Sequence, residues 1–183
     1  MTYTIDIAGM KRDLPLCPVT DDLYIGAFVI FGDVEMTIHA ARELLARAPA
    51  FDYIIAPEAK AIPLAYEMSR QSGVQYLLAR KKPKAYMRGV FEVRVQSITT
   101  FGVQTLVIDS GDAEKMKGKR ILIVDDVIST GESLRAMEEL VKKAGGEIVA
   151  KMAVLVEGDA INRPDITVLA PLPVFNPDGT VKG

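Results

Sequence analysis

The sequence contains one cysteine, one histidine and no tryptophan among 183 residues. Because Cys17 is alone, an internal disulfide and a cysteine-based zinc site are excluded, and such low cysteine use fits a reducing compartment. No apolar run approaches the roughly 20 residues that cross a bilayer, and the N-terminus lacks the apolar segment of a secretion signal. The formal net charge is −2, so we expect a cytoplasmic protein with no nucleic acid and no membrane as partner.

Hydrophobic residues make up 49% of the chain and charged residues 25%, which is typical of a globular protein. The length fits a single domain over residues 1–183. Residues 1–31 contain Pro15 and Pro18 and show no regular pattern apart from an extended stretch at 24–31. We expect this segment to form a small cap on the main fold.

Beyond residue 31, short apolar segments alternate with stretches whose apolar residues recur at helical spacing. The pattern predicts strands at 53–56, 75–79, 121–124, 148–156 and 166–169, and helices at 33–48, 62–71 and 132–144. Residues 99–109 are expected to form one or two strands interrupted at Gly102, whereas residues 80–96 are basic and weakly patterned. This alternation predicts an α/β fold with a mostly parallel sheet flanked by helices.

Three of the predicted strands end in polar segments. These are Glu58-Ala59-Lys60, Arg80-Lys81-Lys82-Pro83-Lys84, and residues 125–133. Because the carboxyl ends of parallel strands share one edge of a sheet, we expect the three segments to meet in one crevice. Residues 80–94 hold six basic residues and one acidic residue, a cluster that favours a highly charged phosphate group.

The third of these segments belongs to the sequence RILIVDDVISTGESL, residues 120–134. Its apolar run predicts a strand buried on both faces, and Asp125 and Asp126 follow at the end of that strand. A turn of Ser129, Thr130, Gly131, Glu132 and Ser133 then opens the next predicted helix. Backbone N–H groups at such a turn can bind a phosphate, and the two carboxylates can bind a diol or lie close to a metal ion. The combination suits a sugar phosphate.

Two other protein classes carry an apolar strand that ends in aspartates. A response-regulator receiver places the acidic pair near its N-terminus with most of the domain beyond it, whereas only 58 residues follow Asp125. A P-loop NTPase needs the pattern GxxxxGK[ST], but Gly118-Lys119 is followed here by Arg120. Neither class fits the chain.

Residues 124–133 resemble the phosphoribosyl-diphosphate (PRPP) binding motif of type I phosphoribosyltransferases. Glu58-Ala59-Lys60-Ala61 resembles the pyrophosphate loop of that family, and Arg80-Lys81 resembles the basic pair that opens its mobile catalytic loop. The order and spacing agree over about residues 50–135, and the segment LPLCPVTDDLYIGAFVIFGD is similar to the adenine phosphoribosyltransferase-like purine branch. The resemblance implies the type I phosphoribosyltransferase fold, with residues 1–31 as a hood over the base site.

At the sugar end, the resemblance implies that Asp125 and Asp126 contact the ribose 2′- and 3′-hydroxyls. The 5′-phosphate would bind the turn at 129–133, through backbone N–H groups and the hydroxyls of Ser129, Thr130 and Ser133.

At the other end, backbone groups of Glu58-Ala59-Lys60 would contact the pyrophosphate. Arg80, Lys81 and Lys84 would neutralise the pyrophosphate as it leaves. The cofactor Mg²⁺ would be held chiefly by pyrophosphate and ribose oxygens and by water, near Asp125 and Asp126.

The implied reaction transfers the phosphoribosyl group of PRPP to a purine base, with adenine favoured, and yields a nucleoside 5′-monophosphate and pyrophosphate in purine salvage. Such a transfer passes through an oxocarbenium-like state, so Mg²⁺ and cationic side chains help most at the leaving group. A long loop at about residues 81–108 would close over the site and exclude water. The resemblance also implies a homodimer.

The chain departs from the family patterns at the positions that bear on the base. Adenine enzymes commonly carry Glu-Tyr-Gly where this chain aligns Thr100-Phe101-Gly102, which removes an expected catalytic carboxylate. Hypoxanthine-guanine enzymes usually have an Asp at the position of Ser129, and orotate enzymes have His-Gly in place of Ala85-Tyr86. Orotate, hypoxanthine and xanthine stay as alternative bases. A PRPP-sensing regulator is the alternative of another class, although the segment before the first helix is too short for a winged helix.

Overall fold

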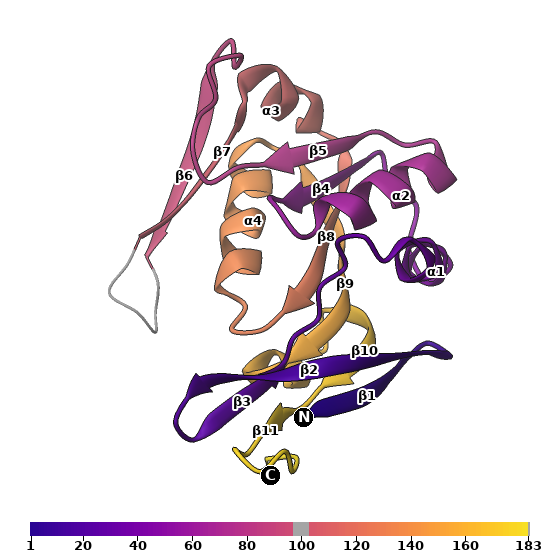
Figure 1. The fold of residues 1–183 in the computed structure, drawn as a ribbon. Coiled ribbons are helices and arrows are strands. Elements are labelled where there is room, and N and C mark those ends of the chain that lie inside the picture. Colours follow the sequence, from indigo (N-terminus) through magenta and orange to yellow (C-terminus); the bar gives the residue numbers. More distant parts are fainter. Residues whose placement is uncertain (97–102, 183) are drawn as a thin grey trace.

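The structure is a computed structural model that describes residues 1–96 and 103–182 (Figure 1). Its strands are β1 (Thr2–Ile7), β2 (Met10–Thr20), β3 (Leu23–Gly26), β4 (Tyr53–Pro57), β5 (Tyr76–Ala79), β6 (Val90–Gln96), β7 (Val103–Asp109), β8 (Arg120–Ile128), β9 (Glu147–Glu157), β10 (Thr167–Leu172) and β11 (Val174–Phe175). Its helices are α1 (Val34–Leu45), α2 (Ile62–Ser72), α3 (Ser110–Met116), α4 (Glu132–Lys143) and the short 3₁₀ helix η1 (Gly158–Asn162). The predicted strands and helices beyond residue 31 are all present, with ends that differ by a few residues.

The central sheet has the strand order β10-β9-β8-β4-β5, and every neighbouring pair is parallel. Along the chain, β4 is followed by β5 on one side, and β8, β9 and β10 are then added on the other side of β4. The order therefore reverses between β4 and β8, which is where open α/β sheets bind their ligands. The predicted α/β fold class is confirmed.

The two faces of this sheet pack against different helices. Successive side chains of a strand point to opposite faces, so Ile54 packs with α1 and α2 while Ile55 packs with α3 and α4. In the same way, Leu122 of β8 belongs to the core that contains α1 and α2, and Ile123 belongs to the core that contains α3 and α4. This burial on both faces explains why the strands read as unbroken apolar runs, and it fixes the direction in which each strand ends.

Residues 1–31, predicted to be irregular, instead form most of an antiparallel sheet with the order β1-β2-β3-β11 (Figure 1). The β1–β2 hairpin turns at Ala8 and Gly9, which both have positive φ values, 51° and 91°. Pro15 pairs with Thr2 at the very start of β1, and Pro18 adjoins an irregularity in the β2–β3 register. The two prolines thus lie where ladder hydrogen bonds are lost at small cost, which is why they do not prevent a strand.

The expected long loop at 81–108 is also more ordered than predicted, because β6 and β7 form a two-stranded antiparallel sheet. Buried Val93 and Leu106 pack this sheet against the core that contains α4, and Lys143 of α4 donates to the backbone oxygen of Glu92 at 3.1 Å. Helix α3 follows directly after β7, in a segment for which the sequence pattern predicted no helix. The interruption predicted at Gly102 and the departure at Thr100-Phe101-Gly102 lie outside the described residues.

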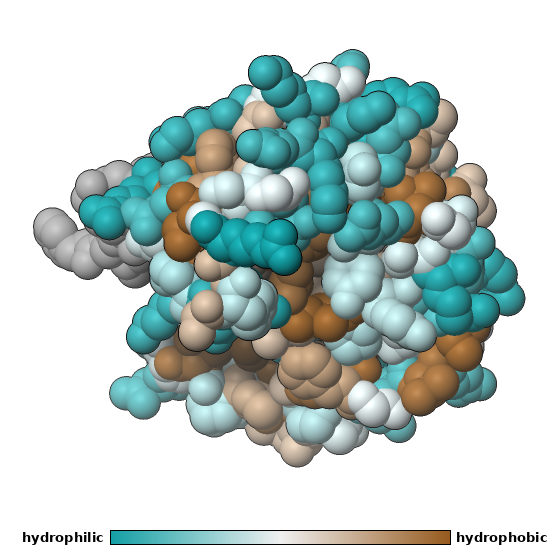
Figure 2. Space-filling model, turned by 90° about the horizontal axis from the view of Figure 1, so that it is seen from above, coloured by the Kyte–Doolittle hydropathy of each residue, from teal (hydrophilic) through white to brown (hydrophobic). Residues whose placement is uncertain are grey.

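Within the described ranges, no helix is both long enough and apolar enough to cross a membrane. Seen from above, the upper part of the view is largely hydrophilic, and hydrophobic areas lie in the central hollow, at the lower left and at the right-hand edge, the side on which α1 and α2 lie in Figure 1 (Figure 2).

Candidate active site

A cleft of about 780 Å³ opens at the carboxyl edge of the central sheet, at the junction between β4 and β8. It is lined by Pro57, Glu58, Ala59, Lys60, Ala61, Lys81, Thr105, Leu106, Asp125, Asp126, Val127 and Ser133. The cleft therefore draws on all three polar segments singled out in the sequence. Its position at the reversal of strand order is the one that the fold favours for a ligand.

The acidic pair lies within the last residues of β8 rather than after the strand, since β8 continues to Ile128. The side chain of Asp126 is 6% exposed, and its Oδ2 has no hydrogen-bond partner among the residues that the structure describes. Its backbone N–H donates to Oδ1 of Asp125 at 2.8 Å. Burial, followed by the negative charge of Asp126, raises the pKa of Asp125 well above its ordinary value. Such a pair is poised to accept hydrogen bonds from a ligand.

Lys60 links the two sides of the junction. It belongs to the loop after β4, and its Nζ lies 3.3 Å from Oδ2 of Asp126 on β8. The Lys60 side chain is 53% exposed and can change partner, whereas Asp126 is held by its strand. The positive charge of Lys60 also favours the ionised form of Asp125, which partly offsets the rise in the pKa of that carboxyl.

The turn at 129–133 joins β8 to α4 and leaves the start of this helix open. Gly131 occupies the N-cap position with a φ of 78°, and no side chain caps the helix, although the N–H of Glu132 lies 3.4 Å from the hydroxyl of Thr130. The first N–H groups of a helix lack partners within the helix and carry the positive end of its dipole. An uncapped 12-residue helix next to a cleft is thus suited to bind an anion.

Glu58 ties the loop after β4 to the loop after β5. Its Oε1 accepts the backbone N–H of Lys81 at 3.0 Å, and its Oε2 accepts Nη1 of Arg80 at 3.0 Å. The N–H of Lys81 and the Arg80 guanidinium hold the pKa of Glu58 below its ordinary value. Arg80 and Val107 also exchange backbone hydrogen bonds of 2.8 and 2.7 Å, so this basic segment is joined to β7 as well. Lys81 consequently faces the cleft from a fixed backbone.

The predicted site residues fall into two groups. Those that line the cleft are Glu58, Ala59, Lys60, Lys81, Asp125, Asp126 and Ser133. Those that lie outside its lining are Arg80, which pairs with Glu58, the exposed Lys84, and the rest of the turn, Ser129, Thr130, Gly131 and Glu132.

Sequence reasoning missed several residues at this edge. Thr105 and Leu106 of β7 line the cleft, because the β6–β7 sheet lies beside it. Glu157 at the end of β9 is half-buried, which raises its pKa, while the neighbouring hydroxyl of Ser129 opposes that rise. The alternation of apolar and polar residues in VFEVRVQ, residues 90–96, is the signal that would have predicted β6. No pattern in the sequence would have predicted that Glu157 lies beside the turn at 129–133.

The described residues contain no group of three or more His, Cys, Asp or Glu side chains arranged to hold a metal ion. What they bring together is a pair of carboxylates suited to hydroxyl groups, an open helix N-terminus suited to a phosphate, and a lysine-bearing loop on the opposite side of the cleft. Fold and site together are those of an α/β protein whose cleft, at the carboxyl edge of a parallel sheet, is suited to a phosphorylated sugar.

Comparison with known proteins identifies the family. The phosphoribosyl transferase domain matches residues 37–169. A relative from Thermotoga maritima, named adenine phosphoribosyltransferase, is 38% identical over 164 residues, 85% of this chain and 87% of that protein. A relative of the same name from Thermotoga petrophila is 39% identical over 107 residues, which span 58% of this chain and 59% of that protein. The chain belongs to the phosphoribosyltransferase family and is a PRPP-dependent glycosyltransferase, as the sequence motifs predicted.

A solved structure supports the fold independently. The adenine phosphoribosyltransferase of Thermoanaerobacter pseudethanolicus superimposes with a TM-score of 0.68 at 22% identity, covering 86% of this chain and 95% of that one. At 22% identity, this likeness bears on the fold alone.

Proposed function

We propose that this chain transfers the phosphoribosyl group of PRPP to adenine, giving adenosine 5′-monophosphate and pyrophosphate in purine salvage. The observation that carries the proposal is the contact between Lys60 and Asp126, which brings a pyrophosphate-type loop and a ribose-type acidic pair together across one cleft. Adenine is favoured because the relatives from both Thermotoga species are named for it.

At the sugar end of the proposed site, Asp125 and Asp126 accept hydrogen bonds from the ribose 2′- and 3′-hydroxyls. Support comes from the buried Oδ2 of Asp126, because an oxygen that has no hydrogen bond in the described protein gains one from the ligand. The turn at 129–133 and the first N–H groups of α4 then hold the 5′-phosphate. These two contacts fix the ribose ring and leave its anomeric carbon facing the loop that contains Lys60.

At the leaving-group end, negative charge grows on the pyrophosphate as its bond to the anomeric carbon breaks. Lys81 lines the cleft on that side, and Arg80 lies behind it in an ion pair with Glu58. Cations fixed before the reaction stabilise the developing charge without further rearrangement. Lys84 is exposed, and its proposed role is to add positive potential around the leaving group.

Mg²⁺ fits this site through oxygen atoms. Mg²⁺ prefers oxygen ligands and keeps several waters, and the cleft offers the buried Oδ2 of Asp126, which has no hydrogen bond among the described residues. Asp125 and Asp126 would lie near an ion held chiefly by pyrophosphate and ribose oxygens. When bound, Mg²⁺ would neutralise charge on the leaving group.

The antiparallel sheet is proposed to act as the hood over the base, with residues 1–31 as its main part in a single domain of residues 1–183. Support comes from its place in the fold, since β11 follows β10 at the carboxyl edge of the central sheet and pairs with β3. Leu172, the last residue of β10, pairs with Glu157, which lies next to Ser129. These pairings support a hood role, because they bring the antiparallel sheet to the carboxyl edge of the central sheet, where the cleft opens.

We further propose a cytoplasmic homodimer. Val34 and Ile38 of α1 and Tyr66 of α2 are large apolar side chains that are 67%, 43% and 58% exposed. The two helices pack side by side, and Gln71 of α2 donates to the backbone oxygen of Ile38 at 3.1 Å. The proposal places the interface on this pair of helices, where a second copy would cover the three exposed side chains. Light scattering after size exclusion tests the dimer, and a monomeric mass at micromolar concentration would exclude it.

The proposed reaction is tested by incubating the protein with PRPP, Mg²⁺ and one base at a time, and measuring pyrophosphate release. Adenine should support release, whereas hypoxanthine, xanthine, guanine and orotate should support much less. Release with another base would correct the specificity and keep the enzyme class. PRPP binding without release in the presence of any base would favour a PRPP-sensing regulator.

A further inference from the structure

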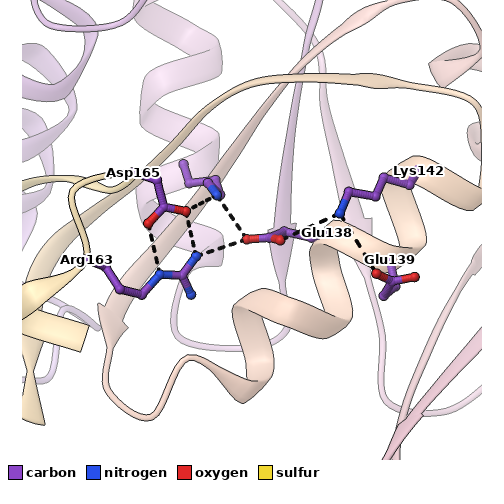
Figure 3. Close-up of polar contacts among 6 residues, drawn as sticks. Glu138, Glu139, Lys142, Arg163 and Asp165 are labelled. Atoms are coloured by element: carbon purple, nitrogen blue, oxygen red, sulfur yellow. Dashed lines mark hydrogen bonds and ion pairs between the residues drawn. The ribbon is translucent and has the colours of Figure 1, made fainter. Parts of the chain in front are cut away.

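Arg163 lies between η1 and β10, and carboxylates on two sides hold its guanidinium in place (Figure 3). Its Nε and Nη2 donate to the two oxygens of Asp165 at 3.0 and 2.7 Å, and Nη2 also donates to Oε1 of Glu138 on α4 at 3.3 Å. Lys151 of β9 donates to the same Glu138 oxygen at 3.1 Å and contacts Asp165 as well. Two cations therefore face two anions at the side of α4.

The third nitrogen of this guanidinium, Nη1, points at the turn that begins α4. A Cβ atom added to Gly131 would lie 3.2 Å from Nη1, so the guanidinium is in close contact with the turn. Nη1 makes no hydrogen bond to any residue in the described ranges. Arg163 is thus fixed through two of its nitrogens and presents the third one to the residue that caps the helix.

Arg163 is one of three cationic side chains that offset three carboxylates beside α4. On the far side of Glu138, Lys142 lies 4.0 Å from Glu138 and 3.9 Å from Glu139 (Figure 3). Three cations then offset three anions. Loss of Arg163 would leave one net negative charge beside the turn, and because the side chains of Glu138 and Lys151 are only 17% and 16% exposed, water would screen it incompletely.

We propose that Arg163 is a positioning residue for the 5′-phosphate of the substrate, acting through the turn at Gly131 that it contacts. This inference rests on the proposed function, in which that turn holds the phosphate. Arg163 keeps the turn in the conformation that directs its N–H groups at the anion, and it offsets Glu138 and Asp165, which would otherwise repel the phosphate. A charged network beside α4 thereby serves a binding site at the N-terminus of the same helix.

The chain offers a matched control at the opposite end of β8. Arg120 makes a similar two-nitrogen contact, with Nη2 at 2.9 Å and Nε at 3.2 Å from the Asp52 carboxylate. It lies at the first residue of β8, whereas the phosphate turn follows the last. Arg120→Met removes an arginine–aspartate pair without touching the turn, so it measures what the loss of such a pair does to the fold alone.

The test compares two ligands by calorimetry: ribose 5-phosphate, which carries the 5′-phosphate, and inorganic pyrophosphate with Mg²⁺, which does not. Arg163→Met should weaken ribose 5-phosphate binding about tenfold, because the turn loses its support and one net negative charge stays beside it, and should change pyrophosphate binding less than about twofold. Arg163→Lys keeps the charge but loses the two-nitrogen contact, so its affinity for ribose 5-phosphate should be intermediate. Arg120→Met should bind both ligands as the wild type does.

Equal binding of ribose 5-phosphate by the wild type and Arg163→Met would overturn the inference and leave the proposed function intact. An equal loss for both ligands would also overturn it, because it would indicate general damage to the fold; thermal unfolding of the same samples would reveal that damage. Failure of the wild type itself to bind ribose 5-phosphate would overturn both the phosphate role of the turn and the role of Arg163.

Discussion

Replacing Asp126 by asparagine should stabilise the ligand-free protein and weaken its binding of PRPP. The Asp126 side chain is 6% exposed, and its Oδ2 has no hydrogen bond among the described residues. A second carboxylate, Asp125, lies beside it with a pKa that burial and the charge of Asp126 raise well above the ordinary value. The substituted amide would keep the shape of the side chain and remove one of two like charges from a poorly hydrated place.

The size of the effect on stability follows from two opposing terms. At 3.3 Å, the attraction between Lys60 and Asp126 is about 5 kcal/mol with an effective dielectric constant of about 20. Because Lys60 is 53% exposed, hydration and side-chain entropy reduce the net contribution to at most about 1 kcal/mol. Against this stands the cost of burying a charged oxygen that has no hydrogen bond and lies beside a second carboxylate, about 1–3 kcal/mol, most of which the uncharged amide avoids. We therefore expect Asp126→Asn to raise the free energy of unfolding by about 1 kcal/mol and Tm by about 2–4 °C.

The effect on binding has the opposite sign. A hydrogen bond from a ribose hydroxyl to a carboxylate is worth about 1.5–3 kcal/mol, so PRPP should bind about 10- to 150-fold more weakly to Asp126→Asn. Scanning calorimetry without ligand and titration calorimetry with PRPP measure the two quantities. Asp52→Asn is the control, because it breaks the exposed pair with Arg120 and should lower stability without changing PRPP affinity. A variant that is less stable than the wild type and binds PRPP normally would refute the reasoning.

The same pair predicts a pH dependence for the ligand-free protein. The pKa of Asp125 is higher in the folded state than its ordinary value of 3.8, so the folded state binds more protons than the unfolded state between the two values. The raised pKa means that protonated Asp125 contributes to the free energy of unfolding at low pH. This contribution is lost as the pH rises from about 3.8 through the raised pKa. In Asp126→Asn the repelling charge is absent, and this fall should be smaller. Unfolding in urea over a pH series measures the difference between the two proteins.

Three further outcomes are expected. Lys81→Ala should lower kcat about 10- to 100-fold while the affinity for the base changes little, because Lys81 lines the cleft on the side proposed for the leaving group; unaltered turnover would remove it from the mechanism. Glu58→Gln should lower kcat/KM for PRPP about three- to tenfold, since it weakens the contacts with Arg80 and the Lys81 N–H, and steady-state kinetics measures it. Gly131→Ala should lose about 1–2 kcal/mol of stability, because alanine at a φ of 78° is strained; an unchanged Tm would contradict that turn conformation.

The parallel sheet and its polar strand ends could be predicted from the sequence because burial on both faces leaves an unbroken apolar run. Ile54 and Ile55 belong to opposite cores, as do Leu122 and Ile123, so neither strand has a polar face to interrupt the run. The polar residues that follow such a run mark the carboxyl end of the strand, which is why the acidic pair and the loop of Lys60 could be expected in one crevice.

The elements that were missed have one face exposed or depend on partners distant in sequence. In β6, buried Val93 alternates with exposed or half-exposed Glu92 and Arg94, and the charged positions gave the segment the look of a basic loop. In β2, Pro15 and Pro18 argued against a strand, but each lies where the ladder begins or shifts. Such positions can be recognised only once the pairing strands are known.

The contact of Arg163 with the turn had no signal in the sequence at all. It requires α4, β9 and the segment before β10 to be packed together, which brings Glu138, Lys151 and Asp165 to one place. Glu138 is separated from Lys151 by 13 positions and from Arg163 by 25, and such pairs cannot be matched by spacing alone. The acidic pair, by contrast, consists of adjacent residues, so a motif could capture it.

Lys60 connects the two halves of the proposed reaction. In the ligand-free protein its charge faces Asp126, and it also opposes the rise in the pKa of both Asp125 and Glu157. In the proposed complex, ribose hydroxyls would donate to the carboxylates in place of Lys60, and this exposed side chain could turn to the pyrophosphate on its own side of the cleft at little cost. The cation that stabilises the empty site is thereby available where negative charge develops during the transfer.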